Sequence, residues 1–244
     1  MKLSEAISFS KKEKIKKWLL AHGADMEWTV IDDNYEITVY ANCDLSGVWG
    51  RKLVNELPDF IKFNVVVKNF SVALNKLKSM KGFPKLVNGN FDISGNDFSS
   101  LEGCPILGDG CHTILLTSNN LKSLKGLNFK NKKLELLDVK YNFLDNSCFE
   151  YIPSHVDHLD ISGNKIKSLK GIHKHVKQCK YFYCNEVPAP SNVLGLFFIE
   201  GLDYISIDNG GQISAIINKN LREGDMHICQ EELIEAGYVS QARL

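Results

Sequence analysis

Apolar and polar positions along this chain repeat with a period of 21 to 23 residues. In each repeat an asparagine stands three residues after one apolar position and two residues before another. Residues 69–84 align without a gap on residues 90–105, and residues 159–172 form a third copy. Repeats of this length cannot bury an apolar face alone, so the pattern predicts coils that close on their neighbours. The repeating asparagines are Asn75, Asn96, Asn119, Asn142, Asn164 and Asn185.

The order of these positions matches the leucine-rich repeat pattern, L-x-x-L-x-L-x-x-N-x-L. It predicts an α/β solenoid, a stack of short parallel strands formed by the L-x-L segments, with helical N- and C-terminal caps. The asparagine amide can satisfy backbone groups that stacking would otherwise bury unpaired. The Ser-Leu-x-Gly segment that follows predicts a tight turn or a 3₁₀ piece. Such an architecture favours a binding surface over a reaction centre.

The repeat also predicts how the chain is organised. Residues 1–66 form an N-terminal cap, which contains a helix over 4–22, a hairpin over 27–40 and a degenerate first coil. Residues 67–190 form the leucine-rich repeat body of six coils, and residues 191–244 form a C-terminal cap. The caps differ from the body because terminal repeats must close the apolar core against water. Within the C-terminal cap we expect a short buried helix over 193–199, a strand over 202–207 and helices over 213–217 and 226–242.

Charge is balanced overall but unevenly distributed. The formal net charge is zero, whereas residues 60–182 carry 18 lysines and 10 acidic residues, a difference of +8. This asymmetry fits either an anionic partner or ordinary solvated lysines. Seven cysteines without a paired short spacing predict buried thiols in a reducing compartment. The longest apolar run, 193–199, is too short to span a membrane, so we expect a cytoplasmic protein.

Motifs that carry chemistry are missing from the sequence. It contains no phosphate-binding G-x-x-x-x-G-K-[ST], G-x-S-x-G, H-E-x-x-H or paired C-x-x-C motif. We therefore predict no enzyme activity, no cofactor and no catalytic residue. Several histidines and cysteines crowd two consecutive coils, but their spacing fits no standard zinc module, so we predict no metal. They are His155, His158, His173, His175, Cys179 and Cys184.

Aligned columns give a candidate binding face. Four residues before the asparagines stand acids and other side chains that we expect on the exposed strand face. The last residue of this column is Tyr181, and the column two residues before the asparagines ends in Tyr183. Aromatic side chains beside polar groups are typical anchors of protein contacts. The alternative is that these are simply tolerated exposed strand residues. The predicted partner-binding residues are Asp92, Asp138, Asp160, Tyr181 and Tyr183.

Lysine recurs in two further columns, which lie three and six residues after the asparagines. These positions predict a basic edge, which can neutralise phosphates. The edge contains no arginine and no interleaved aromatic residue, both of which nucleic-acid recognition favours. Solvated lysines that discourage edge association are the other interpretation. The basic edge comprises Lys78, Lys81, Lys122, Lys125, Lys167 and Lys170.

Several segments outside the repeat resemble one family. The sequence at 28–39, the step at 57–58 and the ends at 196–202 and 229–237 are similar to those of small leucine-rich repeat proteins of large tailed bacteriophages. So are the repeat segments 100–105 and 118–126. The resemblance covers nearly the whole chain, and it implies a viral origin and a life in the cytoplasm of the infected bacterial host. It brings no enzyme activity and no known binding residues. The segment 49–52 and the acidic strand face depart from the family.

These observations favour a non-enzymatic protein-binding module. The resemblance points to a host bacterial protein, such as a component of a defence system, as the partner. One alternative is a nucleic-acid-associated protein that uses the lysine strip, and another is a structural component of the virion. A membrane partner is not expected.

Overall fold

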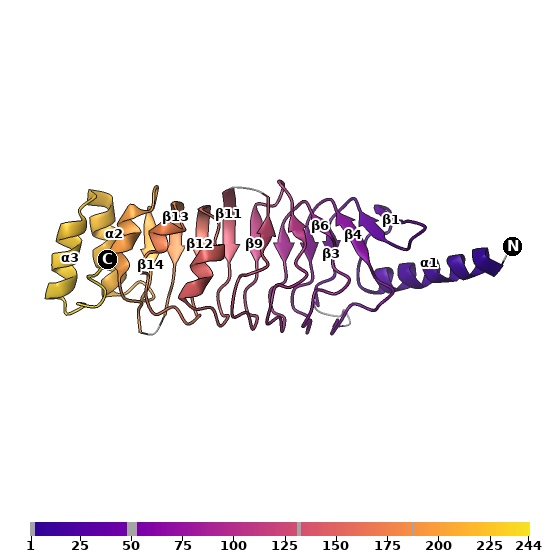
Figure 1. Ribbon diagram of the computed structural model, residues 1–244, viewed down its shortest axis with the longest axis horizontal. Helices are drawn as coiled ribbons and strands as arrows, with labels where there is room; N and C mark the ends of the chain where they lie inside the picture. Colours follow the sequence, from indigo (N-terminus) through magenta and orange to yellow (C-terminus); the bar gives the residue numbers. More distant parts are fainter. Residues whose placement is uncertain (1–2, 48–52, 131–132, 187) are drawn as a thin grey trace. The chain divides into compact units, whose positions relative to one another are not determined.

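The computed structural model describes residues 3–47, 53–130, 133–186 and 188–244 (Figure 1). Side chains are described from residue 10 onward within these ranges. The expected irregularity at 49–52 lies outside the described residues. The chain divides into two compact units. The first unit comprises Met1–Asn119 and Gly126–Asn131, and the second comprises Asn120–Lys125 and Lys132–Leu244. The boundary between them falls inside the predicted repeat body 67–190.

The first unit is a parallel-strand β-solenoid with two sheets. In one sheet β3, β5, β7 and β9 pair in parallel, in that order. In the other, β2, β4, β6, β8 and β10 pair in parallel, and β1 joins β2 as the antiparallel hairpin expected over 27–40. The sequence pattern predicted only one strand in each coil, so the second sheet is an addition. The strands are β1 (Thr29–Ile31), β2 (Ile37–Val39), β3 (Cys43–Asp44), β4 (Phe63–Val66), β5 (Phe70–Ser71), β6 (Leu86–Val87), β7 (Phe91–Asp92), β8 (Ile106–Leu107), β9 (Thr113–Leu115) and β10 (Asn128–Phe129).

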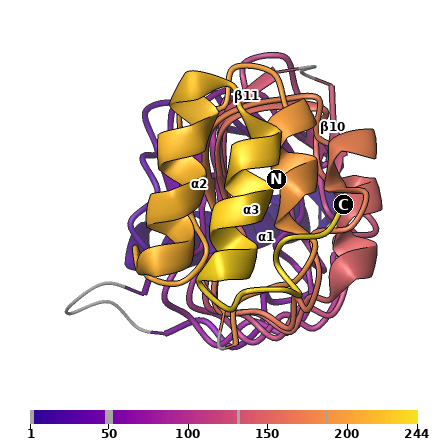
Figure 2. The same ribbon diagram turned by 90° about the vertical axis from the view of Figure 1, so that its left-hand side faces the viewer.

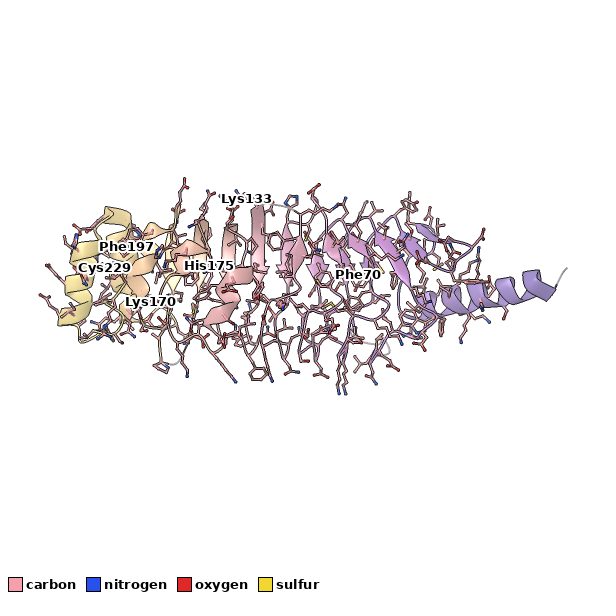
Figure 3. All side chains as sticks on the ribbon, viewed as in Figure 1. Phe70, Lys133, Lys170, His175, Phe197 and Cys229 are labelled. Carbon is pink, nitrogen blue, oxygen red and sulfur yellow. The ribbon has the colours of Figure 1, made fainter. Side chains whose placement is uncertain are left out.

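Aromatic residues fill the interior of the first unit. Phe70, labelled in Figure 3, and Phe91 are register partners on neighbouring coils. Their stacked ring centroids are 6.2 Å apart. Phe83 packs edge-on against Phe70 at 5.3 Å. Helix α1 (Leu3–Ala21) precedes the hairpin, and its residues Ile15 and Leu19 are buried. Burial of side chains of this size contributes roughly 1.5–3 kcal/mol each, so the end of the helix is anchored to the unit.

The second unit is also a parallel-strand β-solenoid, but its coils return differently. Strands β11, β12, β13 and β14 pair in parallel, in that order. Short 3₁₀ helices replace the second sheet. One of them, η2 (Ile172–Lys174), directly follows the Ser-Leu-x-Gly segment at 168–171, for which a tight turn or a 3₁₀ piece was predicted. Two helices, α2 and α3, pack side by side at the C-terminal end (Figure 2). The bounds are β11 (Lys133–Asp138), η1 (Asn146–Tyr151), β12 (His155–Asp160), η2 (Ile172–Lys174), β13 (Gln178–Tyr183), η3 (Val193–Phe198), β14 (Tyr204–Ser206), α2 (Gln212–Glu223) and α3 (Met226–Glu235).

The last helix is shorter than predicted. Asp225 caps its start by accepting the backbone N–H of Ile228 at 3.0 Å. The helix stops at Glu235 rather than at residue 242, because Gly237 adopts a left-handed φ of 85° and the N–H of Tyr238 bonds back to the carbonyl of Leu233. This is the usual way in which glycine ends a helix.

Five of the six repeating asparagines hold adjacent coils together in the same way. Each accepts, through Oδ1, a backbone N–H of the preceding coil: Asn75 from Val54, Asn96 from Leu77, Asn119 from Phe98, Asn142 from Leu121 and Asn164 from Leu144, at 2.8–3.1 Å. The residue before each of the five has a left-handed φ of 55–66°. Those residues are Leu74, Gly95, Ser118, Tyr141 and Gly163.

Asn185 departs from this arrangement. The pairing of β12 with β13 sets Asp160 opposite Tyr183, an offset of 23 residues, so Asn185 aligns with Ser162 and not with Asn164. Its backbone N–H donates to the Ser162 Oγ at 3.0 Å, and its Oδ1 accepts from the Ser206 hydroxyl at 2.8 Å. The position that corresponds to Asn164 is residue 187, which the structure does not describe. The sequence alignment was therefore two residues out of register in this coil.

Candidate protein-binding face

The outward face of the second unit carries two rows of side chains across its strands. The first row runs through the register partners Asp138, Asp160, Tyr183 and Ser206. The second row runs through Leu136, His158, Tyr181 and Tyr204. Parallel strands stand about 4.8 Å apart, so equivalent side chains of neighbouring strands touch. The buried residues Leu137, Leu159, Phe182 and Ile205 alternate with these rows and point into the core.

Four rings form a cluster on this face. The ring centroids of His158 and Tyr181 are 4.4 Å apart, and those of Tyr183 and Tyr204 are 5.9 Å apart. His158 is exposed, and the three tyrosines are half-buried. Lys180 places its Nζ 5.3 Å from the centre of the Tyr181 ring. Rigid, partly exposed rings of this kind offer contact area at a small cost in side-chain entropy.

Two of the predicted acids, Asp138 and Asp160, form ion pairs with a neighbouring lysine. Lys140 bridges the pair, with its Nζ 3.0 Å from Asp138 Oδ2 and 3.7 Å from Asp160 Oδ2. The hydrogen bond to Asp138 raises the pKa of Lys140 above its usual value. Two carboxylates and one ammonium leave this group with a net negative charge, which is smaller than the sequence suggested because Lys140 neutralises one acid.

The acids also have a local structural role. Asp138 Oδ1 accepts the backbone N–H of Lys140 at 3.2 Å, and Asp160 Oδ1 accepts that of Ser162 at 3.0 Å. In the first unit Asp92 bonds the N–H of Ser94 in the same way, at 2.9 Å. A side-chain oxygen that bonds a backbone N–H two residues on is an Asx turn, which ends the strand. The recurrence of aspartate in this column therefore has a structural cause as well as any functional one.

The predicted site residues do not all come together. Asp138, Asp160, Tyr181 and Tyr183 share the face of the second unit, whereas Asp92 lies on β7 of the first unit. The alignment assigned Tyr181 to the column of the acids, and the strand pairing assigns Tyr183 to it instead. Burial, followed by the neighbouring Tyr204 and Asp160, raises the pKa of the Tyr183 hydroxyl.

Sequence reasoning left two rings of this face, His158 and Tyr204, out of the binding site. It placed Lys140 in a column of the same face but gave it no role. Tyr204 belongs to β14, beyond the last recognisable repeat, so no asparagine marked its column. His158 had been considered only as a metal ligand. The correct offset of 23 residues between β12 and β13 would have brought it beside Tyr181.

The predicted basic edge is distributed over both units. Lys78 and Lys81 belong to the first unit, where Lys81 forms an ion pair with Asp59 at 2.5 Å. The remaining four lysines belong to the second unit, where Lys170 is visible in Figure 3. Their side chains are exposed, and no carboxylate of the described residues lies within ion-pair distance of them. These four are Lys122, Lys125, Lys167 and Lys170.

Metal-binding and redox groups do not converge. Within the described part of the chain, no three His, Cys, Asp or Glu side chains are placed to hold a metal ion. Burial raises the pKa of Cys148 and of Cys179 to about 12, so these thiols stay protonated at neutral pH. None of the described helices is long and apolar enough to cross a membrane. No family model, curated protein or solved structure matches the chain.

Proposed function

We propose that the chain is a leucine-rich repeat protein of bacteriophage origin that binds a protein of the bacterial host. The five equivalent asparagines and the repeat pattern support the leucine-rich repeat type. The phage origin rests on the resemblance of the repeats and of both ends to the phage family. A host protein, such as a component of a defence system, is the partner that this origin favours.

The observation that carries the binding role is the ring cluster of the second unit. His158, Tyr181, Tyr183 and Tyr204 lie on one face of paired strands, and each keeps part of its surface exposed. Aromatic residues are enriched among the side chains that dominate binding energy. Asp138 and Asp160 border the cluster and add negative charge, which orients a partner that carries a basic patch. We assign no catalytic role to any of these residues.

The test begins with capture of a partner by the full chain from a lysate of the infected host. The affinity of that partner is then measured for the wild type, for Tyr183→Ala and for Lys122→Ala at two salt concentrations. We expect Tyr183→Ala to lose roughly 1–3 kcal/mol of binding free energy, because it removes a ring at the centre of the cluster. Lys122→Ala should change the affinity little.

The nucleic-acid alternative gives the opposite result. If the exposed lysines Lys122, Lys125, Lys167 and Lys170 led the binding, affinity would fall steeply with salt, because each phosphate contact releases counterions. The tyrosine variant would then bind like the wild type. That outcome would refute the ring cluster as the interface.

A further inference from the structure

The first unit contains a pocket that none of the preceding roles uses. It has a volume of about 280 Å³ and lies where α1, the β1–β2 turn and the segment before β4 meet. Small-molecule sites have volumes of roughly 300–1,000 Å³, so this pocket lies just below the lower end of that range. It has room for one ring and one anionic group, but not for a dinucleotide.

Cations dominate the lining of this pocket. Lys11 and Lys14 come from α1, and Lys62 comes from the segment before β4. Lys11, Lys14 and Ile15 are spaced i, i+3 and i+4, so they lie on one face of the helix. Ile15 is buried, which anchors that face to the unit and keeps the two lysines at the pocket. No carboxylate of the described residues lies within ion-pair distance of these three lysines.

Aromatic rings hold two of the ammonium groups in place. The Nζ of Lys14 lies 4.2 Å from the centre of the Phe60 ring, and that of Lys11 lies 4.9 Å from the centre of the Tyr35 ring. Both rings line the pocket. A cation held over a ring face loses less freedom when it binds an anion, so these lysines are partly organised before any ligand arrives.

The acidic side chain in the lining of the pocket already has a hydrogen-bond partner. Asp59 also lines the wall, but its carboxylate bonds the Lys81 Nζ at 2.5 Å, and this bond lowers the pKa of Asp59. The Asp59 carboxylate therefore stays charged; its hydrogen bond goes to Lys81, outside the set of three lysines, and Lys62 acts on it only through its charge. The pocket keeps an excess of positive charge that is suited to a multivalent anion.

The β1–β2 turn, which lines this pocket, contains a residue with a strained backbone conformation. Tyr35 has a φ of 62°, which is unusual for an aromatic residue. Asp32 holds this turn, because its Oδ1 accepts the backbone N–H groups of Asn34 and Glu36 at 2.9 and 2.8 Å. The turn sets the Tyr35 ring on the wall of the pocket opposite α1. Strained backbone of this kind concentrates at ligand sites.

We propose that this pocket binds a small phosphorylated molecule of mononucleotide size. The phosphate is held by Lys11, Lys14 and Lys62, and the ring of the ligand packs against Phe60 and the apolar floor at Ile15. Lysine ammonium groups are common phosphate ligands. The apolar floor and the aromatic walls favour an organic phosphate over inorganic phosphate, because only the former has apolar surface to bury.

The test is calorimetric titration of the full chain with adenosine monophosphate, adenosine and inorganic phosphate at low salt. We expect adenosine monophosphate to bind with a Kd below about 1 mM, and the other two to bind at least about tenfold more weakly. Lys14→Gln and Lys62→Gln should each weaken the nucleotide by about tenfold while the melting temperature stays unchanged. The matched control is Lys68→Gln, an exposed lysine of the same unit that is not part of the pocket.

Three results would overturn the proposal. The first is an absence of heat from the wild type with adenosine monophosphate. The second is an equal loss in the Lys68→Gln variant, which would indicate a diffuse effect of charge. The third is binding of a single-stranded oligonucleotide without binding of the mononucleotide, which would indicate a nucleic-acid surface in place of a pocket. Partner binding through the ring cluster of the second unit is measured separately, so either proposal can fail alone.

Discussion

The side-chain Oδ1 of Asn119 accepts the backbone N–H of Phe98, one coil earlier, at 3.1 Å. The same amide donates through Nδ2 to the carbonyls of Ile93 and Leu116, at 3.0 and 3.1 Å. Asn119 is 6 % exposed, so water cannot replace these bonds. One buried amide thus satisfies a donor and an acceptor of the neighbouring coil as well as an acceptor of its own, and no aliphatic side chain can do this.

Asn119→Ala should therefore destabilise the protein by about 1–3 kcal/mol, because it leaves buried backbone groups without partners. Urea unfolding, followed by circular dichroism, measures the loss. The matched control is Asn120→Ala, since Asn120 is the exposed neighbour in the sequence. Equal unfolding midpoints for the two variants would show that the side-chain amide of Asn119 does not stabilise the stack of coils.

The five regular asparagines were predictable because a local pattern carries them. An apolar residue three positions earlier and another two positions later identify each one. Asn185 satisfied the same spacing by coincidence. The register of β13 is set by burial of Cys179 and Phe182 against Val156 and Leu159, and this tertiary choice overrides the position of a single asparagine.

The second sheet of the first unit and two of the four clustered rings, His158 and Tyr204, were not predictable in this way. Strands such as β6 (Leu86–Val87) and β8 (Ile106–Leu107) have two residues, which is too few for an alternating pattern to be recognised. The ring cluster depends on which residues of adjacent coils are opposite one another. An error of two residues in one coil was enough to separate Tyr181 from His158, whereas Tyr204 lies beyond the last repeat that an asparagine marks.

Gly163→Ala tests the left-handed backbone conformation of the residue that precedes each of the five regular asparagines. Gly163 has a φ of 65°, and an added Cβ would come within 2.5 Å of the Tyr141 ring. We expect a loss of stability of about 1–2 kcal/mol from the backbone, with a further loss from the displaced ring. Gly210→Ala is the control, because Gly210 has a similar φ of 74° with nothing within 4 Å.

A variant of Tyr141 separates the cost of the left-handed backbone at residue 163 from the cost of the contact with the Tyr141 ring. Tyr141 itself has a φ of 55°, so Tyr141→Gly relieves backbone strain and also removes the ring that crowds residue 163. In that background Gly163→Ala should cost no more than Gly210→Ala. Thermal unfolding of the wild type, the three single variants and the double variant provides the comparison, and an unchanged penalty in the double variant would refute the contact with the ring.

Glu186→Gln should stabilise the protein at neutral pH. The Glu186 Oε1 accepts the backbone N–H of Asn164 at 2.8 Å, and burial raises the pKa of this carboxyl above its ordinary value of 4.5. A raised pKa means that the folded state binds the proton more tightly than the unfolded state. The stabilising contribution is thus complete below pH 4.5 and is lost as the pH rises through the folded value.

Glutamine keeps the acceptor and never carries the charge. The melting temperature of Glu186→Gln should exceed that of the wild type at pH 7, and the difference should vanish below about pH 4. Glu150→Gln, at an exposed position, serves as the control and should leave the melting temperature unchanged at pH 7. A gain in Glu186→Gln that persists undiminished in acid would contradict burial of the charge as its cause.

Two substitutions of Asp160 separate its turn from its charge. Its Oδ1 accepts the backbone N–H of Ser162, and its Oδ2 lies 3.7 Å from the Lys140 Nζ. Asp160→Asn keeps the acceptor but removes the charge, whereas Asp160→Ala removes both. We expect the alanine variant to lose about 1 kcal/mol of stability, and the asparagine variant to stay within about 0.5 kcal/mol of the wild type.

Partner binding should respond differently. If the acids beside Tyr183 orient a basic partner, Asp160→Asn slows association several-fold at low salt, and the difference shrinks as salt screens the charge. Surface plasmon resonance with the captured partner measures both rates. Asp109→Asn, an exposed acid of the first unit, changes the net charge equally and should leave association unchanged. Normal association of Asp160→Asn would mean that the acids only end their strands and that the tyrosines bind without them.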